Sequence, residues 1–85
     1  MMNDKYDRFG MKFKLILRSE LCQTVYNILF DKMIVVRADE KEIHLKFDSE
    51  SIANQVFNNE DYLYLLGYAT ESILGSMREL RFFYL

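Results

Sequence analysis

The stretch MIVVRADEKEIHLKF, residues 33–47, carries the clearest structural signal in the chain. Its first part, residues 33–38, is a continuous run rich in β-branched side chains, as in a buried strand. Three polar residues follow, after which Ile43, Leu45 and Phe47 alternate with polar neighbours, the period of a half-buried strand. The stretch therefore predicts an antiparallel β-hairpin with one buried face.

Two helices are predicted before this hairpin. In residues 5–18 apolar side chains recur at helical spacing, but their alternation with Lys12 and Lys14 also fits a strand. A helix is favoured because the segment is long and its basic residues lie toward the C-terminal end, where they complement the helix dipole. Ser19 is then predicted to cap a second helix that runs to about Phe30. The stripe of the first segment consists of Tyr6, Phe9, Phe13, Ile16 and Leu17.

Two further helices and a closing strand are predicted after the hairpin. Polar residues 48–51 can cap a short helix that ends near Asn58 and Asn59. A longer helix runs from Asp61 to about residue 76, with Gly75 placed to end it. Residues 80–85 alternate like a strand. The predicted order is ααββααβ, an α+β domain in which a three-stranded sheet packs against helices.

Composition places the chain among small globular domains. It has 85 residues, no proline and only three glycines, so residues 1–85 are expected to form a single domain with residues 1–4 flexible. The 11 basic and 13 acidic residues give a net charge of −2, which provides no overall attraction to nucleic acid or to an anionic membrane. No apolar run approaches the ~18–20 residues that span a bilayer, and a cytoplasmic location is expected.

Residues suited to catalysis or metal binding are sparse. His44, the only histidine, is expected on the exposed face of the hairpin, and Cys22, the only cysteine, is expected to be a packed core thiol. The carboxylates lack the spacing of a metal loop, and no glycine-rich phosphate loop is present. We therefore expect no catalytic residue, no metal, no cofactor and no enzymatic activity.

The first segment interleaves rings with basic residues, which allows three interpretations. The rings could pack in the core, or stack with the bases of a single-stranded nucleic acid, or leave one ring exposed as an anchor for a protein partner. Phe9 is the candidate for such an anchor. A second candidate surface is the outward side of the third helix, next to Phe57. The predicted protein-interaction residues are Tyr6, Phe9, Lys12, Phe13, Ser51, Asn54 and Gln55.

The succession of elements resembles the N-terminal domain of the bacterial replication initiator DnaA, which has a KH-like order of helices and strands. The resemblance covers residues 6–85 and is one of spacing and residue character. Its carriers are Phe9 and Phe13, the segments 25–29 and 41–45, the segments 51–56 and 61–63, and Leu80-Arg81-Phe82.

The resemblance implies a domain that mediates self-association, including a weak homodimer, and recruits the replicative helicase or initiation regulators. In that family an aromatic residue on the first helix serves self-association, and Phe9 takes its place here. The family usually has tryptophan at that position and again where this chain has Ile28. Its ring for helicase contact corresponds to Ser51, so the expectation of helicase contact is weaker than that of the fold.

Alternative readings remain open. The helicase loader DciA and the C-terminal region of the clamp-loader tau subunit have a similar element order and would keep the function within replication. A KH-like module for single-stranded nucleic acid is another alternative, but the GXXG loop that clamps a nucleic-acid backbone is absent. Little direct nucleic-acid binding and no membrane binding are therefore expected. The chain could be part of a larger initiator or a free-standing adaptor.

Overall fold

The computed structural model describes the backbone of residues 4–85 and the side chains of residues 8–85. The predicted order ααββααβ is confirmed, and the ambiguous segment 5–18 is helical. The prediction of flexibility for residues 1–4 concerns three residues outside the described part, whereas Asp4 begins the first helix. The elements are α1 (Asp4–Glu20), α2 (Gln23–Leu29), β1 (Ile34–Ala38), β2 (Glu42–Phe47), α3 (Glu50–Phe57), α4 (Glu60–Leu74) and β3 (Glu79–Tyr84).

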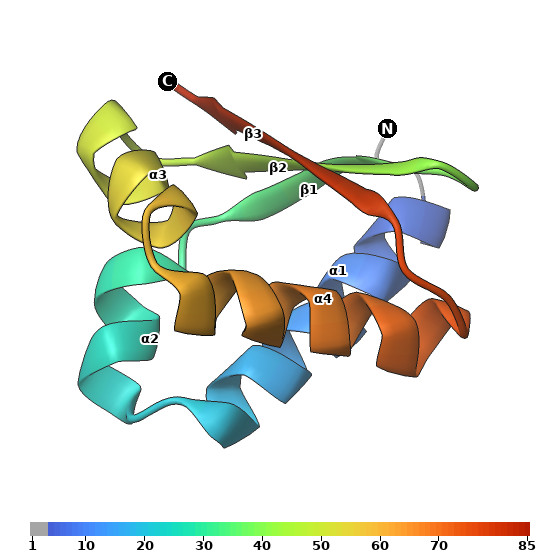
Figure 1. Cartoon of the computed structure of the whole chain (residues 1–85), viewed down its shortest axis with the longest axis horizontal. Coiled ribbons are helices and arrows are strands. Elements are labelled where there is room, and N and C mark those ends of the chain that lie inside the picture. Colours follow the sequence, from blue (N-terminus) through green and yellow to red (C-terminus); the bar gives the residue numbers. More distant parts are fainter. Residues whose placement is uncertain (1–3) are drawn as a thin grey trace.

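The three strands form a mixed sheet in the order β1-β2-β3. The hairpin strands β1 and β2 are antiparallel, as predicted, with a register shift between Val35 and Arg37. The closing strand β3 pairs with β2 in parallel, which the α3–α4 crossover makes possible. Figure 1 shows the sheet above α1, α2 and α4, with α3 at one end. The domain therefore has two layers, and β1 and β3 are the two edges of the sheet.

The core lies between the sheet and the helices. The apolar phase of β2, Ile43, Leu45 and Phe47, is buried, while the alternate residues are half-buried on the opposite face, which confirms the predicted hairpin face. The ring of Phe30 lies edge-on to Phe47 at 6.3 Å and to Tyr62 at 6.0 Å between ring centres. These edge-to-face contacts are the arrangement that aromatic side chains favour.

Local capping explains three helix ends: the starts of α3 and α4 and the end of α4. Ser49 caps α3 by accepting a hydrogen bond from the N–H of Ile52, and the side chain of Asn59 caps α4. Gly75 ends α4 with φ 81°, a left-handed conformation that glycine adopts without a steric penalty. The cap within residues 48–51 and the helix end at Gly75 were both predicted from the sequence.

The predicted cap at Ser19 is wrong. The helix α1 continues through Glu20, and the hydroxyl of Ser19 donates to the carbonyl of Ile16 within it. The residue that precedes α2 is Cys22, whose side chain makes no capping hydrogen bond. A serine hydroxyl can bond to the preceding helical turn as readily as to a following one, and here it bonds to the preceding turn of α1.

Candidate protein-interaction surfaces

The predicted anchor on α1 is not exposed. Phe9 is 6% exposed and Phe13 fully buried, with their rings stacked at 5.3 Å between centres. The expectation of an exposed Phe9 ring is therefore wrong: the aromatic stripe of α1 faces α4 and the sheet, because that packing removes the largest apolar surface from water. Lys12 is exposed, as the prediction requires, and the side chain of Tyr6 lies outside the described residues.

Two other apolar residues occupy the outer side of α1. Met11 and Leu15 are 67% and 58% exposed, and they lie one helical turn apart. The exposed basic side chains of Arg8, Lys12 and Arg18 share this side of the helix. We call Met11 and Leu15 with these three basic residues the α1 ridge. The sequence signal was present, because Met11 and Leu15 are out of phase with the aromatic stripe once the segment is read as a helix.

Lys14 does not belong to the α1 ridge. Its ammonium donates to the carbonyl of Asp31 at 2.7 Å, which ties α1 to the loop before β1. Burial of the ammonium lowers the pKa of Lys14 from its ordinary value, and the nearby Asp31 carboxylate partly offsets this effect. Lys14 therefore stabilises the fold through this hydrogen bond and is not available to a partner.

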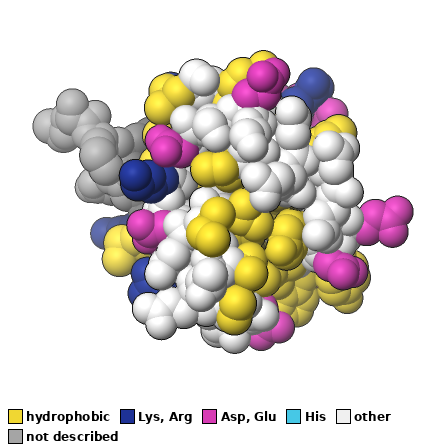
Figure 2. Space-filling view, turned by 90° about the vertical axis from the view of Figure 1, so that its left-hand side faces the viewer, with side chains coloured by type: hydrophobic (Ala, Val, Ile, Leu, Met, Phe, Trp, Pro, Cys, Tyr) yellow, Lys and Arg dark blue, Asp and Glu magenta, His cyan; other side chains and the backbone are white. Residues whose placement is uncertain are grey.

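The second predicted surface, on α3, is exposed as expected. Ser51, Asn54 and Gln55 all face outward, and the Gln55 amide lies 3.4 Å from the Ser51 hydroxyl. Beside them, Ile28 on α2 is 58% exposed and lines a small pocket of about 130 Å³ together with Ile52. Figure 2 shows this side of the molecule, where hydrophobic side chains form a band with both acidic and basic side chains around its margin. We call it the α2–α3 face.

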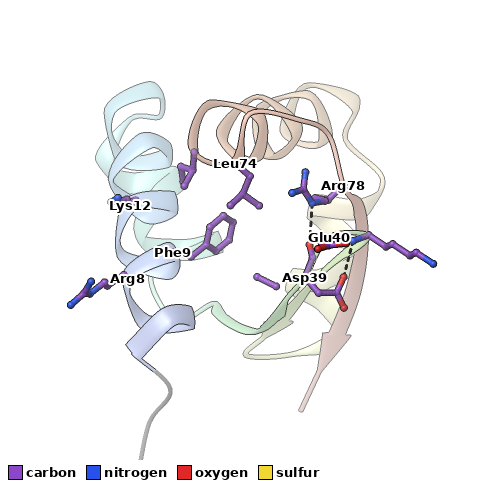
Figure 3. Close-up of a pocket in the computed structure, with 10 residues that line it drawn as sticks. Arg8, Phe9, Lys12, Asp39, Glu40, Leu74 and Arg78 are labelled. Carbon is purple, nitrogen blue, oxygen red and sulfur yellow. Dashed lines mark hydrogen bonds between the residues drawn. The ribbon is translucent and has the colours of Figure 1, made fainter.

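A cavity with a volume of about 710 Å³ lies between α1, the hairpin turn and the end of α4. In Figure 3, Phe9 and Leu74 point toward this space, Arg8 points away from it, and Asp39 and Arg78 lie on the opposite wall. The floor is apolar and the polar groups stand at the rim. This composition suits an apolar side chain better than a polar substrate.

The charged groups at the rim hold the hairpin turn together. One carboxylate oxygen of Asp39 accepts from the N–H groups of Lys41 and Glu42 at 2.8 Å, and the other accepts from Arg37 at 2.9 Å. These hydrogen bonds, the backbone ones foremost, keep the pKa of Asp39 below its ordinary value. Arg78 in turn donates to the carbonyl of Asp39 at 3.0 Å. Asp39 is thus an ionised, structural carboxylate rather than a group ready to accept a proton.

His44 lies on the outward face of the sheet, as predicted, but its side chain is only 18% exposed. It shares a 2.8 Å hydrogen bond with Glu42 and packs against the ring of Phe83 at 5.2 Å. This hydrogen bond and the nearby Arg81 guanidinium lower the pKa of Glu42. The sequence gives no way to foresee the Phe83 contact, because it depends on the parallel register of β3.

The prediction that Cys22 is a core thiol is wrong, since this residue is exposed. It lies in the short connection between α1 and α2, where the chain turns and its side chain points outward. Within residues 8–85 no three histidine, cysteine or acidic side chains are grouped so that they could hold a metal ion. No helix in the described part of the chain is long and apolar enough to cross a membrane.

Comparison of the sequence with protein-family models and with curated proteins finds no match. The surfaces themselves therefore carry the functional argument. What they offer is exposed apolar area on helices: the α1 ridge with a basic frame, and the α2–α3 face with a margin of mixed charge.

Proposed function

We propose that this chain is a non-catalytic protein-interaction domain of a bacterial replication-initiation protein, acting in self-association and in recruitment of the replicative helicase or an initiation regulator. The observation that carries the proposal is the α1 ridge. Met11 and Leu15, 67% and 58% exposed, leave apolar area in water that a partner could bury. Full burial of a side chain of this size contributes about 1.5–3 kcal/mol.

The basic frame of the α1 ridge defines the kind of partner that fits. Arg8, Lys12 and Arg18 surround the apolar pair, so a complementary surface has an apolar centre and acidic residues around it. The guanidinium of Arg18 also lies 5.1 Å above the ring of Tyr26, which limits its freedom and favours a defined geometry for the pair it would form. The α2–α3 face, with Ser51, Asn54 and Gln55, is a second docking surface.

The burial of the α1 rings favours a protein partner over a nucleic acid. Single-stranded nucleic acid is held without sequence preference by bases stacked on exposed rings beside basic groups. On α1 the basic groups are exposed, but Phe9 and Phe13 are not. Among the α1 side chains that the structure describes, a nucleic acid would therefore meet exposed charge without an exposed ring to stack on.

The test uses a variant with Met11→Ser and Leu15→Ser. The matched control is Tyr64→Ser, which removes a 78% exposed ring from α4, outside both proposed surfaces. Binding to the purified replicative helicase of the source bacterium is followed by nuclear magnetic resonance titration, and self-association by sedimentation. We expect the ridge variant to bind the helicase at least about tenfold more weakly, the effect of losing one to two buried apolar side chains.

Circular dichroism of each variant checks the fold, which these exposed positions should leave intact. Unchanged binding by the ridge variant would remove the α1 ridge from the interface. If the wild-type domain neither self-associates nor binds helicase, the replication role fails. Salt-sensitive binding to a single-stranded oligonucleotide, lost in Lys12→Glu, would instead favour the nucleic-acid alternative.

A further inference from the structure

The strand β3 has an open edge. The N–H of Glu79 donates to the carbonyl of Lys41 at 2.9 Å, at the start of the parallel pairing with β2. Because backbone groups alternate along a strand, every second residue from Glu79 onward directs its N–H and C=O toward β2. The N–H and C=O of Leu80, Phe82 and Tyr84 therefore point to the other side. Within the described residues they have no hydrogen-bond partner in another element.

The opposite edge of the sheet is different. β1 has only five residues, and the register shift between Val35 and Arg37 interrupts its row of backbone groups. The helix α1 packs against the inner face of β1, where a Cβ placed on Gly10 would lie 3.8 Å from the Val35 side chain. Bulges are one way in which proteins protect a sheet edge. β3 is regular over its six residues and lacks a bulge.

A groove runs along the open edge between α3 and β3. It has a volume of about 380 Å³ and is lined by Ala53, Asn54 and Phe57 from α3 and by the side chains of β3. In Figure 1, β3 is the strand at the front of the sheet, with α3 at its C-terminal end. Two large apolar residues that line the groove remain exposed, Phe57 (57%) and Tyr84 (48%), and Phe83 (44%) is exposed on the opposite face of the strand.

We infer that this edge pairs with the β3 edge of a second copy of the chain, so that two β3 strands lie antiparallel across a twofold axis and join the two sheets. This interface is separate from the α1 ridge and does not rest on it. The occupant follows from the sequence of the strand itself, because β3 is complementary to its own reverse in one particular register.

In that register Phe82 lies opposite the same residue of the other copy, at the centre of residues 79–85. The outward backbone groups of Leu80 then exchange two hydrogen bonds with those of Tyr84 in the second copy. On the side of the groove, Leu80 of one copy lies beside Tyr84 of the other, and the two Phe82 rings lie beside each other. On the open face, Arg81 lies opposite Phe83, a cation–π pair.

Neighbouring registers are less favourable. Centring the pair on Arg81 places two guanidinium groups opposite each other, which destabilises a strand pair. Centring it on Phe83 shortens the overlap and moves Arg81 opposite Leu85. The registers centred on Arg81 and on Phe82 each pair five residues of β3, and of these two only the register centred on Phe82 avoids opposition of like charges. After pairing, the outer edges are the bulged β1 strands, so the assembly closes as a dimer and does not extend into a filament.

The first test compares Tyr84→Pro with Tyr84→Ala. Both lose the 2.9 Å hydrogen bond from the tyrosine hydroxyl to Glu50, but only proline removes the outward N–H, once in each copy. Residue 83 is already extended, as a residue before proline prefers. By sedimentation from micromolar to millimolar concentration, we expect dimerisation of Tyr84→Pro to be at least about tenfold weaker than that of Tyr84→Ala.

The second test measures the register by disulfide formation in a Cys22→Ser background. Residues 81 and 83 of opposite copies form a non-hydrogen-bonded pair, whose Cα separation of about 4.5 Å permits a disulfide. A mixture of Arg81→Cys and Phe83→Cys chains should cross-link under mild oxidation, and neither variant alone should do so. Cross-linking of Arg81→Cys or of Phe83→Cys alone would overturn the register.

Three results would overturn the inference as a whole. The wild-type chain could remain monomeric throughout the concentration range, or the two Tyr84 variants could dimerise equally. Dimerisation could instead be lost in the Met11→Ser, Leu15→Ser variant and kept in Tyr84→Pro, which would assign self-association to the α1 ridge. A monomeric chain whose Tyr84→Pro variant loses helicase binding would show that the edge takes a strand of a different protein.

Discussion

Replacing Phe9 with alanine is expected to destabilise the fold rather than to remove a contact surface. The ring is 6% exposed and stacked on Phe13, so truncation to alanine removes buried apolar area and leaves a void. Truncations of buried phenylalanine cost about 3–5 kcal/mol. We place Phe9→Ala near 3 kcal/mol, at the lower end, because the ring borders the open cavity of Figure 3 and the void is continuous with solvent.

That loss is large for this chain. At ~0.05–0.15 kcal/mol per residue, an 85-residue domain has a free energy of unfolding of about 4–13 kcal/mol. Phe9→Ala would then remove between a quarter and three quarters of it. The matched control on the same helix is Met11→Ala, whose side chain is 67% exposed and should change the stability by no more than about 0.5 kcal/mol.

Urea unfolding followed by circular dichroism and tyrosine fluorescence measures both variants, since the chain has six tyrosines and no tryptophan. The midpoint should fall for Phe9→Ala with an unchanged slope, which would show a change in stability and not in the extent of unfolding. A loss under about 1 kcal/mol for Phe9→Ala, or an equal loss for Met11→Ala, would refute the placement of the aromatic stripe in the core.

Three other changes test the fold. Gly75→Ala should lower the free energy of unfolding by about 1–2 kcal/mol in a urea titration, because φ is 81°. Gly10→Ala should raise it by about 0.5–1 kcal/mol, since the added methyl meets its nearest neighbour at 3.8 Å. Equal effects of the two substitutions would contradict the assigned backbone. Ser49→Ala should cost about 1 kcal/mol by thermal unfolding, and Ser49→Asp should restore the cap. The His44 hydrogen bond, with help from an arginine on β3, lowers the pKa of Glu42 below its ordinary 4.5, so its stabilisation is complete above about pH 4.5 and is lost as the pH falls through the lowered value. Glu42→Gln should flatten the acid side of the melting temperature against pH, and an unchanged curve would exclude this role.

Local signals were enough to predict most of the elements. Strict alternation in residues 43–47, the cap at Ser49 and Gly75 after α4 each act within a few residues, so the sequence displays them directly. The segment of α1 was ambiguous because apolar residues on two sides of a helix also alternate. Its burial resolves the ambiguity: the aromatic stripe is the core side, and Met11 with Leu15 is the other.

The candidate surfaces could be predicted only in part. The outward positions of Ser51, Asn54 and Gln55 follow from the helical phase of α3, which the neighbouring core residues fix. The exposure of Phe9 or Cys22 depends instead on which elements pack beside them, and periodicity contains no such information. The parallel direction of β3 was likewise not predicted, because an alternating pattern is the same for both strand directions. The open edge and its groove follow from that direction and from the position of α3.

The parallel pairing of β2 with β3 has a kinetic consequence. The hairpin can form from neighbouring residues, but Ile43 reaches its partner Leu80 only after the intervening chain has folded back. Such distant contacts require closure of a long loop, and they slow folding relative to local ones. Until β3 docks, the second edge of β2 is uncovered in a strand whose inner face is fully apolar. The time to this last step therefore determines how long the nascent domain is susceptible to aggregation through its own central strand.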